Sequence, residues 1–586
     1  MQKNAWIAIE AKLNHSIFRE RMDLNRKYLK TLDEKRLLAG YFMEAGLNSN
    51  IHLESFPKFY GAAGGGFETP ECQVKGSYAG HYMSACAYLY RFEGDEEMKS
   101  RGDKMVDWLE ECQKESEDGW VCSIPSLYLD RIARDKWVWA PQYMVHKTLM
   151  GLIDMYRYAN NKKALEIADK WSDWFVNWTD KFDEERLAKL ADWESGGLME
   201  SWADLYAITG KEKYKVLAGR YYRRNLFDPL IAGEDILTFK HANTSIPEVH
   251  GCARTYEVTG EEKYRKAVEA FWHFAIDERD QWASGGQNNR EMWVSDLTEN
   301  ISASTQEFCT VYNTIRLAEY LFRWTGEAKY AEVMELLLYN GVLAQQNKVT
   351  AQTCYFLPMA GGSKKRWMGN YDSFVCCNGT MAQAQTSYGD KLIYQKEGAI
   401  CVPQYIPFCA EATIDGEAVK ISMNYGNSNQ RIYEIAVSTK SPLEFALFVR
   451  KPEWSETLGI AIDNQPLNLC PKDGWVEIRR VWSENTVVSI SPEYKMIPVK
   501  LGEQDNRFAF RFGPILMAAL SDGEHSLCGD AEKTAKSIDT SKLIFADLYG
   551  RDSAYIVNKR TNFKLVPLYR ITDEAYQVYF PFIDFV

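Results

Sequence analysis

Clustered positive charge is missing from this sequence of 586 residues. Its 69 Lys and Arg are outnumbered by 81 Asp and Glu, which gives a net charge of −12. Proteins that bind nucleic acids neutralise phosphates with a local excess of Lys and Arg, so we expect no nucleic-acid partner. A run of about 18 apolar residues, which a membrane-spanning helix needs, is also missing, and we expect no membrane partner.

A disulfide framework is not indicated either. The 13 cysteines are an odd number scattered over a long chain, which fits reduced thiols plus a metal site better. The first residues, Met1 to Trp6, do not open the apolar core of a signal peptide. We therefore expect a cytoplasmic protein, although removal of a signal would leave the same sequence.

The overall amino-acid composition, with 46% hydrophobic and 26% charged residues, is typical of a soluble globular protein. The length exceeds one hydrophobic core, so we expect about two to four domains. Aromatic residues reach 13%, with 18 Trp and 34 Tyr. Such rings line carbohydrate clefts and also fill cores, and composition alone favours the core.

A short motif repeats within positions 1–389, where apolar residues recur at helical spacing. In each copy an apolar, aromatic helix end is followed by Gly or Asn and a polar turn, the pattern of a tight connection between two helices. The copies lie at positions 89–95, 155–161, 205–211, 255–261 and 321–327. They are roughly 50 to 66 residues apart, so the unit is a helical hairpin. With a sixth, divergent pair we predict an (α/α)6 helical toroid; an open α-solenoid would show the same period.

The pattern changes after position 389. Positions 390–500 hold alternating β-branched and aromatic runs with turn residues about every ten positions, and we predict a β-sandwich domain there. Positions 501–586 are also rich in strand-forming residues. We predict a second β-rich domain for them, while a return of the chain to the first sandwich stays open.

Metal-ligand residues gather in one segment of the helical region. Glu307 and Cys309 form a Glu-x-Cys pair, and Cys376 and Cys377 are adjacent. The adjacent cysteines could be buried thiols by chance, a strained vicinal disulfide or neighbouring metal ligands. The Glu-x-Cys pair favours the last interpretation, because the segment then offers the oxygen and three sulfur ligands of a tetrahedral Zn²⁺ site. Spacing alone favours a structural role for such a site over a catalytic one.

The residues around this cluster resemble a known enzyme family. Glu-Phe-Cys-Thr-Val-Tyr-Asn at 307–313 and Phe-Val-Cys-Cys-Asn-Gly-Thr at 374–380 are similar to motifs of the β-L-arabinofuranosidases of glycoside hydrolase families 127 and 146. Further similar segments lie at 24–29, 145–147, 241–244, 339–343, 355–358, 449–454 and 513–514. The resemblance extends over nearly the whole chain, and the paired cysteines downstream of Glu-x-Cys are its most specific part.

The resemblance implies a catalytic (α/α)6 barrel with β-sandwich domains, and retaining, exo-acting hydrolysis of terminal β-L-arabinofuranosyl residues in plant-derived glycans. It implies a Zn²⁺ ion held by Glu307, Cys309, Cys376 and Cys377, with Cys376 as the attacking thiolate. Zn²⁺ keeps a coordinated thiol deprotonated, and a thiolate is a strong nucleophile. Glu291 follows a Gly-Gly pair as the acid/base of the family does, and we expect a raised pKa for its carboxyl group. A surface Glu in a polar loop is the alternative.

Further residues are expected to line the sugar pocket, either because they match pocket positions of the family or because they lie in loops that face the same funnel. They are His146, His241, Glu335, Tyr355, His81, Glu68 and Glu200. For the histidines, a satisfied position at a helix end is the alternative. For Glu335, an exposed helix face would explain the residue equally well.

Several alternatives stay open. The same fold and mechanism could act on another rare plant sugar, and Ser245, where many relatives carry a second His, indicates a changed pocket. A non-catalytic carbohydrate-binding protein with a structural zinc belongs to a different class, and a toroid-type polysaccharide lyase is a third option. The expected partner is an oligosaccharide or glycoside substrate, and a homodimer is possible.

Overall fold

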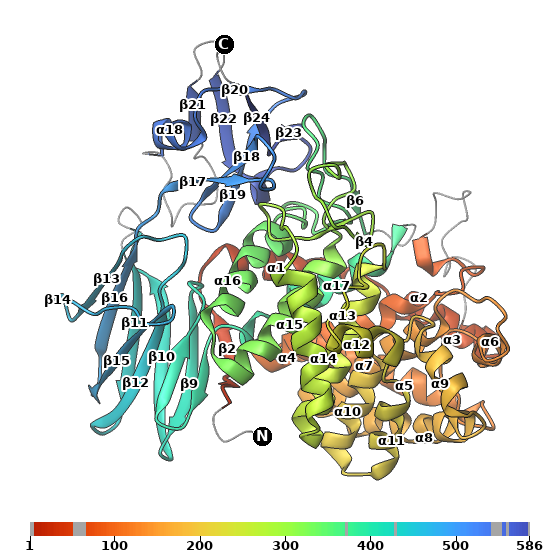
Figure 1. Cartoon of the computed structure of the whole chain (residues 1–586). Coiled ribbons are helices and arrows are strands. Elements are labelled where there is room, and N and C mark those ends of the chain that lie inside the picture. Colours follow the sequence, from red (N-terminus) through yellow and green to blue (C-terminus); the bar gives the residue numbers. More distant parts are fainter. Residues whose placement is uncertain are drawn as a thin grey trace.

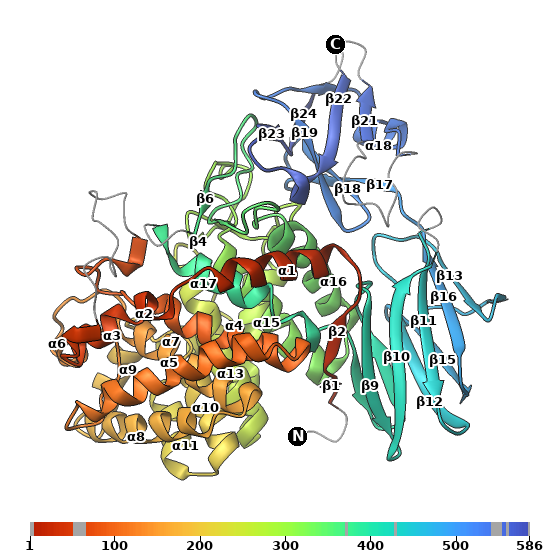
Figure 2. The same ribbon diagram turned by 180° about the vertical axis from the view of Figure 1, so that it is seen from behind.

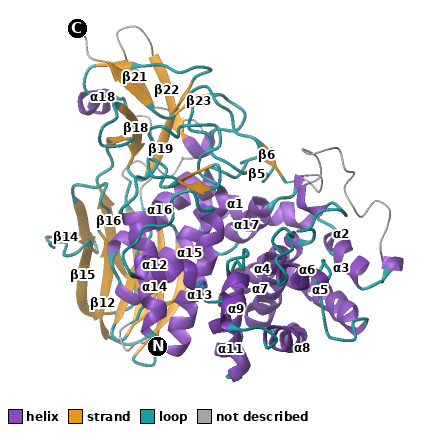
Figure 3. Cartoon of the chain, turned by 45° about the vertical axis from the view of Figure 1, so that its right-hand side comes forward, coloured by secondary structure: helices purple, strands orange, loops and turns teal. Residues whose placement is uncertain are grey.

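The computed structural model describes residues 5–50, 66–369, 373–426, 431–540, 554–557 and 562–583 (Figure 1). Helices fill one side of the molecule and β-sheets the other (Figure 3). Apart from two short strands near the N-terminus and four two-residue strands between positions 288 and 368, the chain passes from a helical region to a mainly β region in sequence order. The predicted fold class is confirmed.

Six inner helices form a closed ring. Each contacts the next along the chain, and the last also contacts the first. In chain order they are α4 (Ser77–Glu93), α7 (Pro141–Ala159), α10 (Leu198–Thr209), α13 (Ala242–Thr259), α15 (Phe308–Thr325) and α17 (Cys376–Ala384). An open solenoid would leave its end helices apart, so the closed ring establishes the (α/α)6 toroid.

Five inner helices are each followed by an outer helix, as the repeated motif predicts. The outer helices are α5 (Glu96–Lys114), α8 (Lys162–Thr179), α11 (Glu212–Arg220), α14 (Glu262–Trp272) and α16 (Ala328–Leu337). The connecting residues Gly94, Asn160, Gly210, Gly260 and Gly326 adopt left-handed conformations with φ between +58° and +73°. Gly and Asn tolerate this conformation, which ends one helix and turns the chain toward the next.

The sixth pair joins the two ends of the helical region. Helix α1 (Ile17–Lys30) lies beside α17 (Figure 2). Asn25 Nδ2 of α1 donates a hydrogen bond of 3.2 Å to the carbonyl oxygen of Ala382 in α17. The rings of Phe18 and Tyr388 also pack edge-to-face with 5.4 Å between their centroids. Because no hairpin turn links α1 to α17, this pair leaves no copy of the motif in the sequence.

Shorter helices flank the ring or lie in the β region. They are α2 (Glu34–Leu37), α3 (Ala39–Glu44), α6 (Leu127–Ile132), α9 (Glu184–Ala191), α12 (Arg224–Ile231) and α18 (Ala531–Ser537). In the part of the chain that the structure describes, no helix combines the length and the apolarity that crossing a bilayer requires.

Two sheets form the β-sandwich. Their strand orders are β1-β7-β8-β12-β15 and β14-β13-β16-β11-β10-β9-β2. The strands are β1 (Ile7–Ala8), β2 (Ala11–Leu13), β7 (Tyr394–Lys396), β8 (Ala399–Val402), β9 (Phe408–Ile414), β10 (Glu417–Tyr425), β11 (Tyr433–Thr439), β12 (Leu443–Arg450), β13 (Leu458–Ile462), β14 (Gln465–Leu467), β15 (Trp475–Trp482) and β16 (Thr486–Pro492). Alternate residues of β11 and β16 are buried, in keeping with the period-two pattern of the sequence.

The sandwich also includes the start of the described chain. Ala8 of β1 is paired with Tyr394 of β7, and Leu13 of β2 is paired with Phe408 of β9. The expectation of helical structure throughout positions 1–389 is therefore wrong for these residues. Strands of two and three residues carry no readable period, and their partners lie far along the chain.

A third sheet contains the last strands. Its order is β20-β24-β18-β19-β22-β21, with β17 paired to β18 and β23 paired to β19. The strands are β17 (Met496–Lys500), β18 (Arg507–Phe512), β19 (Ile515–Leu520), β20 (Leu527–Cys528), β21 (Ala554–Val557), β22 (Asn562–Pro567), β23 (Tyr576–Gln577) and β24 (Phe580–Ile583). This sheet is separate from the two sandwich sheets. The domain boundaries at 389/390 and 500/501 stay predictions.

Candidate active site

A cavity of about 210 Å³ lies at one end of the barrel, where the loops before the inner helices meet. Seven of the predicted catalytic, binding or metal-ligating residues line it. The seven are Cys376, Cys309, Glu291, His146, His241, Tyr355 and His81. Residues that are far apart in sequence are thus brought to one concave site, which is where ligands of a helical barrel are expected.

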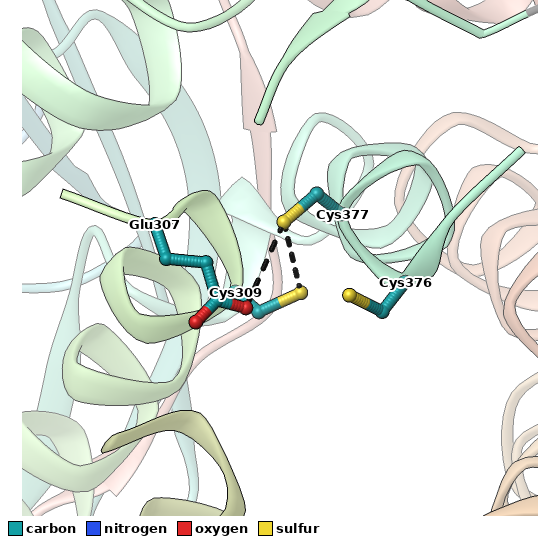
Figure 4. Close-up of side chains that lie close together, drawn as sticks. All are labelled: Glu307, Cys309, Cys376 and Cys377. Carbon is teal, nitrogen blue, oxygen red and sulfur yellow. Dashed lines mark hydrogen bonds between the residues drawn. The ribbon is translucent and has the colours of Figure 1, made fainter. Parts of the chain in front are cut away.

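The starts of two inner helices form the metal-ligand cluster. Glu307 is the N-cap residue of α15 and Cys309 lies in its first turn, while Cys376 and Cys377 begin α17. Their four ligand atoms lie within 4.8 Å of one another. The Sγ atoms of Cys309 and Cys377 are 3.3 Å apart, and Cys377 Sγ is 3.9 Å from a carboxylate oxygen of Glu307 (Figure 4). The predicted convergence of these residues is seen in the structure.

Neighbouring residues explain the local sequence at the start of α17. The Asn378 side-chain oxygen accepts a hydrogen bond of 2.9 Å from the backbone N–H of Val375, which caps the helix. A Cβ atom on Gly379 would lie 2.2 Å from Cδ2 of His81. The His81 ring is held there by a 2.6 Å hydrogen bond between its Nδ1 and Gln383. Only glycine leaves room for this ring beside the paired cysteines.

The cluster can hold a metal ion. All 13 cysteines are free, so the vicinal disulfide interpretation is wrong. Burial raises the pKa of the Glu307 carboxyl group and of the Cys309 and Cys377 thiols. Four acidic groups so close together cannot all ionise in the protein interior unless a cation lies among them.

Cys376 differs from the other two thiols. Hydrogen bonds with Cys309 and Cys377 hold the pKa of its thiol well below the usual value, although burial opposes this shift. Its position at the N-terminus of α17 favours the same ionised form. Cys376 is only half-buried and lines the cavity, whereas Cys377 is fully buried. It is therefore the more accessible of the two paired cysteines.

Glu291 reaches the cavity from a strained turn. Strands β3 (Asn288–Asn289) and β4 (Met292–Trp293) form a hairpin whose two-residue turn is Arg290 and Glu291. Both turn residues have positive φ, +47° and +68°. This is the backbone geometry of a type I′ turn, whose two positions are normally occupied by Gly or Asn. A residue of another type in this left-handed conformation destabilises the fold by about 1 to 2 kcal/mol. Strain of this kind persists where the surroundings fix the backbone, which is common at functional sites.

Tyr355 connects the turn to the cysteine cluster. Its hydroxyl group donates a hydrogen bond to a Glu291 carboxylate oxygen and lies 3.5 Å from Cys376 Sγ. On the other side of the carboxylate, His241 Nε2 is 3.7 Å from the second oxygen. His241 Nδ1 lies 2.8 Å from the hydroxyl oxygen of Thr244, which can accept its proton, so the Nε2–H of a protonated ring faces Glu291.

The pKa of Glu291 differs from the expectation. The hydrogen bond with His241 lowers the pKa of the carboxyl group, burial opposes the shift, and the Tyr355 hydroxyl adds to it. Burial alone would lower the pKa of His241, but Glu291 and the nearby Glu307 raise it to about 9. The expected raised pKa of Glu291 is thus wrong for the protein without substrate, because the proton of the pair resides on the imidazole.

Glu335 is not in the cavity. It lies on the outer helix α16, where its carboxylate is 2.7 Å from Arg450 Nη2 and accepts a hydrogen bond of 2.8 Å from Trp454 Nε1. It is 2% exposed, so the exposed-face alternative is also wrong. Arg450 ends strand β12, and this ion pair joins the barrel to the sandwich.

Glu68 and Glu200 also lie outside the cavity. Glu68 accepts hydrogen bonds of 2.7 and 3.2 Å from two backbone amides at the start of α4. Glu200 accepts hydrogen bonds of 2.6 Å from Arg316 and 2.7 Å from Tyr320. It lines a second cavity of about 130 Å³ that is walled by ion pairs between the inner helices. Both carboxylates support the barrel, and neither reaches the site of Cys376 and Glu291.

The two histidines of the first hairpins and Ser245 have distinct placements. His81 and His146 line the cavity, and burial lowers the pKa of both. Their role in sugar binding stays a prediction. Ser245 is absent from the cavity wall, since its hydroxyl group accepts a hydrogen bond of 3.0 Å from Trp293 Nε1 behind it. The indication of a changed pocket from Ser245 stays a prediction.

Lys147 is a cavity residue that the sequence reasoning missed. It is 9% exposed, and its Nζ lies 4.9 Å from the centroid of the Tyr143 ring. Among the residues that the structure describes, no carboxylate forms an ion pair with it. Tyr143, His146, Lys147 and Met150 all face the cavity from α7, and their spacing of three to four residues was the available signal.

Two family matches cover most of the chain. The β-L-arabinofuranosidase GH127 catalytic domain matches residues 10–390, and the GH127 middle domain matches residues 399–493. Both matched domains belong to glycoside hydrolase family 127. Of the two families that the sequence resembles, the matches therefore show family 127. No protein of curated function matches the sequence.

Solved structures share the whole architecture. The GH127 β-L-arabinofuranosidase Ara127N-Se from Geobacillus stearothermophilus T6 is 18% identical with a TM-score of 0.75, and the similarity covers 98% of this chain and 100% of that one. The GH127 β-arabinofuranosidase BT3674 is 16% identical with a TM-score of 0.76, covering 100% of this chain and 99% of that one. At such identities the structures show the fold, and the domain matches show the family. The chain belongs to the β-L-arabinofuranosidase family GH127 and is a glycoside hydrolase.

Proposed function

We propose that the protein is a retaining exo-glycosidase that releases terminal β-L-arabinofuranosyl residues from plant-derived glycans, with Cys376 as the nucleophile and Glu291 as the acid/base. The observation that carries the proposal is the single hydroxyl group of Tyr355 between the two side chains. Retaining glycosidases hold nucleophile and acid/base about 5 to 5.5 Å apart, a spacing that one bridging hydroxyl group can span. The small cavity favours one terminal sugar over the interior of a chain.

Glu307, Cys309, Cys376 and Cys377 would hold Zn²⁺. In a tetrahedral site with Zn–S bonds of about 2.3 Å, neighbouring sulfurs are roughly 3.8 Å apart. The donor atoms of the cluster, all within 4.8 Å of one another, suit such a site. The bound ion would keep the thiols deprotonated at neutral pH.

The chain's own groups account for both halves of the reaction. In the first, Cys376 Sγ forms a bond to the anomeric carbon while the bond to the leaving oxygen breaks, and that oxygen takes a proton from the Glu291–His241 pair. In the second, Glu291 removes a proton from water, the water oxygen bonds to the anomeric carbon, and the carbon–sulfur bond breaks. Two inversions retain the configuration. The protonated imidazole beside the carboxylate is the proton source that a low carboxyl pKa alone would not supply.

The proposal is tested by measuring zinc content together with sustained release of L-arabinose from a para-nitrophenyl β-L-arabinofuranoside. The native protein is expected to hold one Zn²⁺ and to hydrolyse the substrate, and Cys376→Ser and Glu291→Gln are expected to lose turnover. Cys401→Ala, a buried cysteine in the sandwich, is the matched control and should keep both properties. Zinc without release of any pentose would contradict the substrate and favour a carbohydrate-binding protein with a structural metal.

A further inference from the structure

The third sheet contacts the loops that carry the active-site residues, although it lies beyond both matched family domains, which end at residue 493. Strand β23 lies beside the loops that contain β4 and β6 (Trp367–Met368), as Figures 1 and 2 both show. Two tyrosines at this strand, Tyr576 and Tyr579, are 0% and 3% exposed, and their hydroxyl groups form hydrogen bonds with those loops.

Tyr579 holds the loop that leads to Glu291. Its hydroxyl oxygen accepts a hydrogen bond of 2.6 Å from the backbone N–H of Ala283. Its ring packs edge-to-face against Trp282, with 6.3 Å between the centroids. Trp282 in turn donates from Nε1 to the carbonyl oxygen of Asn288 at 3.1 Å, at the base of the hairpin whose turn contains Glu291. A short series of contacts therefore connects Tyr579 to the strained turn.

Tyr576 holds the loop that carries Tyr355. Its hydroxyl group donates to the carbonyl oxygen of Pro358 at 2.7 Å. Its backbone accepts a hydrogen bond of 2.9 Å from Gly362 and donates one of 3.1 Å to Ser363. Pro358 lies three positions after Tyr355, so the third sheet fixes this loop close to the residue that contacts both Cys376 and Glu291.

The two loops also contact each other directly. The hydrogen bond from Tyr355 to Glu291 joins them at the cavity, and the backbone N–H of Met359 donates to the carbonyl oxygen of Ser302 at 2.9 Å behind it. Because the left-handed turn at Arg290 and Glu291 is unfavourable by itself, its geometry depends on such outside contacts. The matched catalytic domain supplies some of these contacts, such as the 2.7 Å hydrogen bond from the Ala242 N–H to the carbonyl oxygen of Glu291, and the third sheet adds those of Tyr576 and Tyr579.

We infer that the third sheet is part of the active site, with Tyr576 and Tyr579 as positioning residues that set Tyr355 and Glu291 against Cys376. The inference deepens the proposed function and rests on it for the roles of Glu291 and Cys376. The contacts themselves do not depend on which sugar is cleaved. Loss of either hydroxyl group should leave the sheet folded and loosen one loop.

The test uses full-length Tyr576→Phe, Tyr579→Phe and the double variant. Tyr405→Phe is the matched control, because its buried hydroxyl group donates to the backbone carbonyl of Arg450 within the sandwich. Misplacement of about 1 Å can cost about 100-fold in rate, so we expect kcat to fall by about 10- to 100-fold in each single variant. KM, zinc content and thermal midpoint should stay near those of the control. The two losses of kcat should not multiply in the double variant, since both substitutions act through the contact between Tyr355 and Glu291.

Hydrogen exchange provides a second readout that does not need activity. In Tyr579→Phe the amides of residues 283–291 should exchange faster than in the native protein, and in Tyr576→Phe those of 355–363 should do so, with no change in the control. Unchanged exchange in these segments would overturn the inference whatever the activity. Faster exchange with native kcat would overturn the positioning role. If the native protein cleaves no arabinofuranoside, the proposed function fails, and the exchange data still decide whether the third sheet holds the loops.

Discussion

Replacing Glu335 by Ala should destabilise the protein without altering the binding of substrate. The carboxylate is 2% exposed and lies between Arg450 Nη2, at 2.7 Å, and Trp454 Nε1, at 2.8 Å. Arg450 is 0% exposed and also contacts Glu332 and, at 2.6 Å, the carbonyl oxygen of Pro403. The substitution thus removes one of two carboxylates from a buried guanidinium group.

Removing one partner of a buried ion pair costs about 3 to 5 kcal/mol, because the other charge is left without compensation. Glu332 remains near Arg450, so we expect the lower end of this range, about 3 kcal/mol. The assay is urea unfolding followed by tryptophan fluorescence, with KM measured on the folded variant at low temperature. The unfolding midpoint should fall and KM should stay within about twofold of the native value, a change of under about 0.5 kcal/mol in binding.

Glu327→Ala is the control for this experiment. Glu327 precedes the same helix and pairs at 3.8 Å with Lys329, and its side chain is 53% exposed. Exposed pairs contribute about 0 to 1 kcal/mol, so its midpoint should barely move. A Glu335→Ala protein with native stability and a strongly raised KM would refute the placement at the sandwich junction and restore Glu335 to the sugar pocket.

Three further predictions concern the cavity and its supports. Burial raises the pKa of Glu68 to about 7, against about 4.3 in the unfolded chain. The contribution of the Glu68 carboxyl group to stability is therefore fully present below pH 4.3 and is lost as the pH rises through 7. Glu68→Gln should raise the thermal midpoint at pH 8 but not at pH 4.5, and KM should be unchanged at both pH values. Lys147→Met should lower kcat/KM by about 10- to 100-fold, the loss of one charged hydrogen bond of about 1.5 to 3 kcal/mol to a sugar hydroxyl group, and Lys147→Arg should recover part of it. Dialysis against a strong chelator should remove zinc and activity together, with recovery on adding Zn²⁺, whereas Cys309→Ser should bind zinc more weakly in equilibrium dialysis; full activity of the metal-free protein would contradict the role of the cluster.

Local chemistry explains what could be predicted. The five Gly and Asn residues that end inner helices reveal the hairpins, because the left-handed conformation after a helix restricts the residue type at that one position. The Glu-x-Cys pair and the adjacent cysteines predict one cluster, since few arrangements other than a metal site bring three thiols and a carboxyl group together. Both signals are short in sequence and strict in geometry.

Long-range packing explains what could not be predicted. The sixth helix pair combines α1 and α17, which no turn connects, and Glu335 was misplaced because the sequence does not show that Arg450 lies opposite it. The lowered pKa of Glu291 depends on His241, which begins a different hairpin of the barrel. The hydroxyl groups of the third sheet act on loops that precede it by more than 200 positions. Such pairings appear only when the chain is folded.

The central claim, that Cys376 attacks the sugar, is tested most directly by trapping the sugar on the enzyme. Glu291→Gln should still be glycosylated by a substrate with a good leaving group such as para-nitrophenol, but it lacks the base for the second step. We expect one burst of para-nitrophenol per enzyme and, by peptide mass spectrometry, one pentosyl residue on the peptide that contains Cys376, absent from Cys376→Ser/Glu291→Gln. A burst with the sugar on a carboxylate, or turnover by Glu291→Gln with no adduct, would contradict the account.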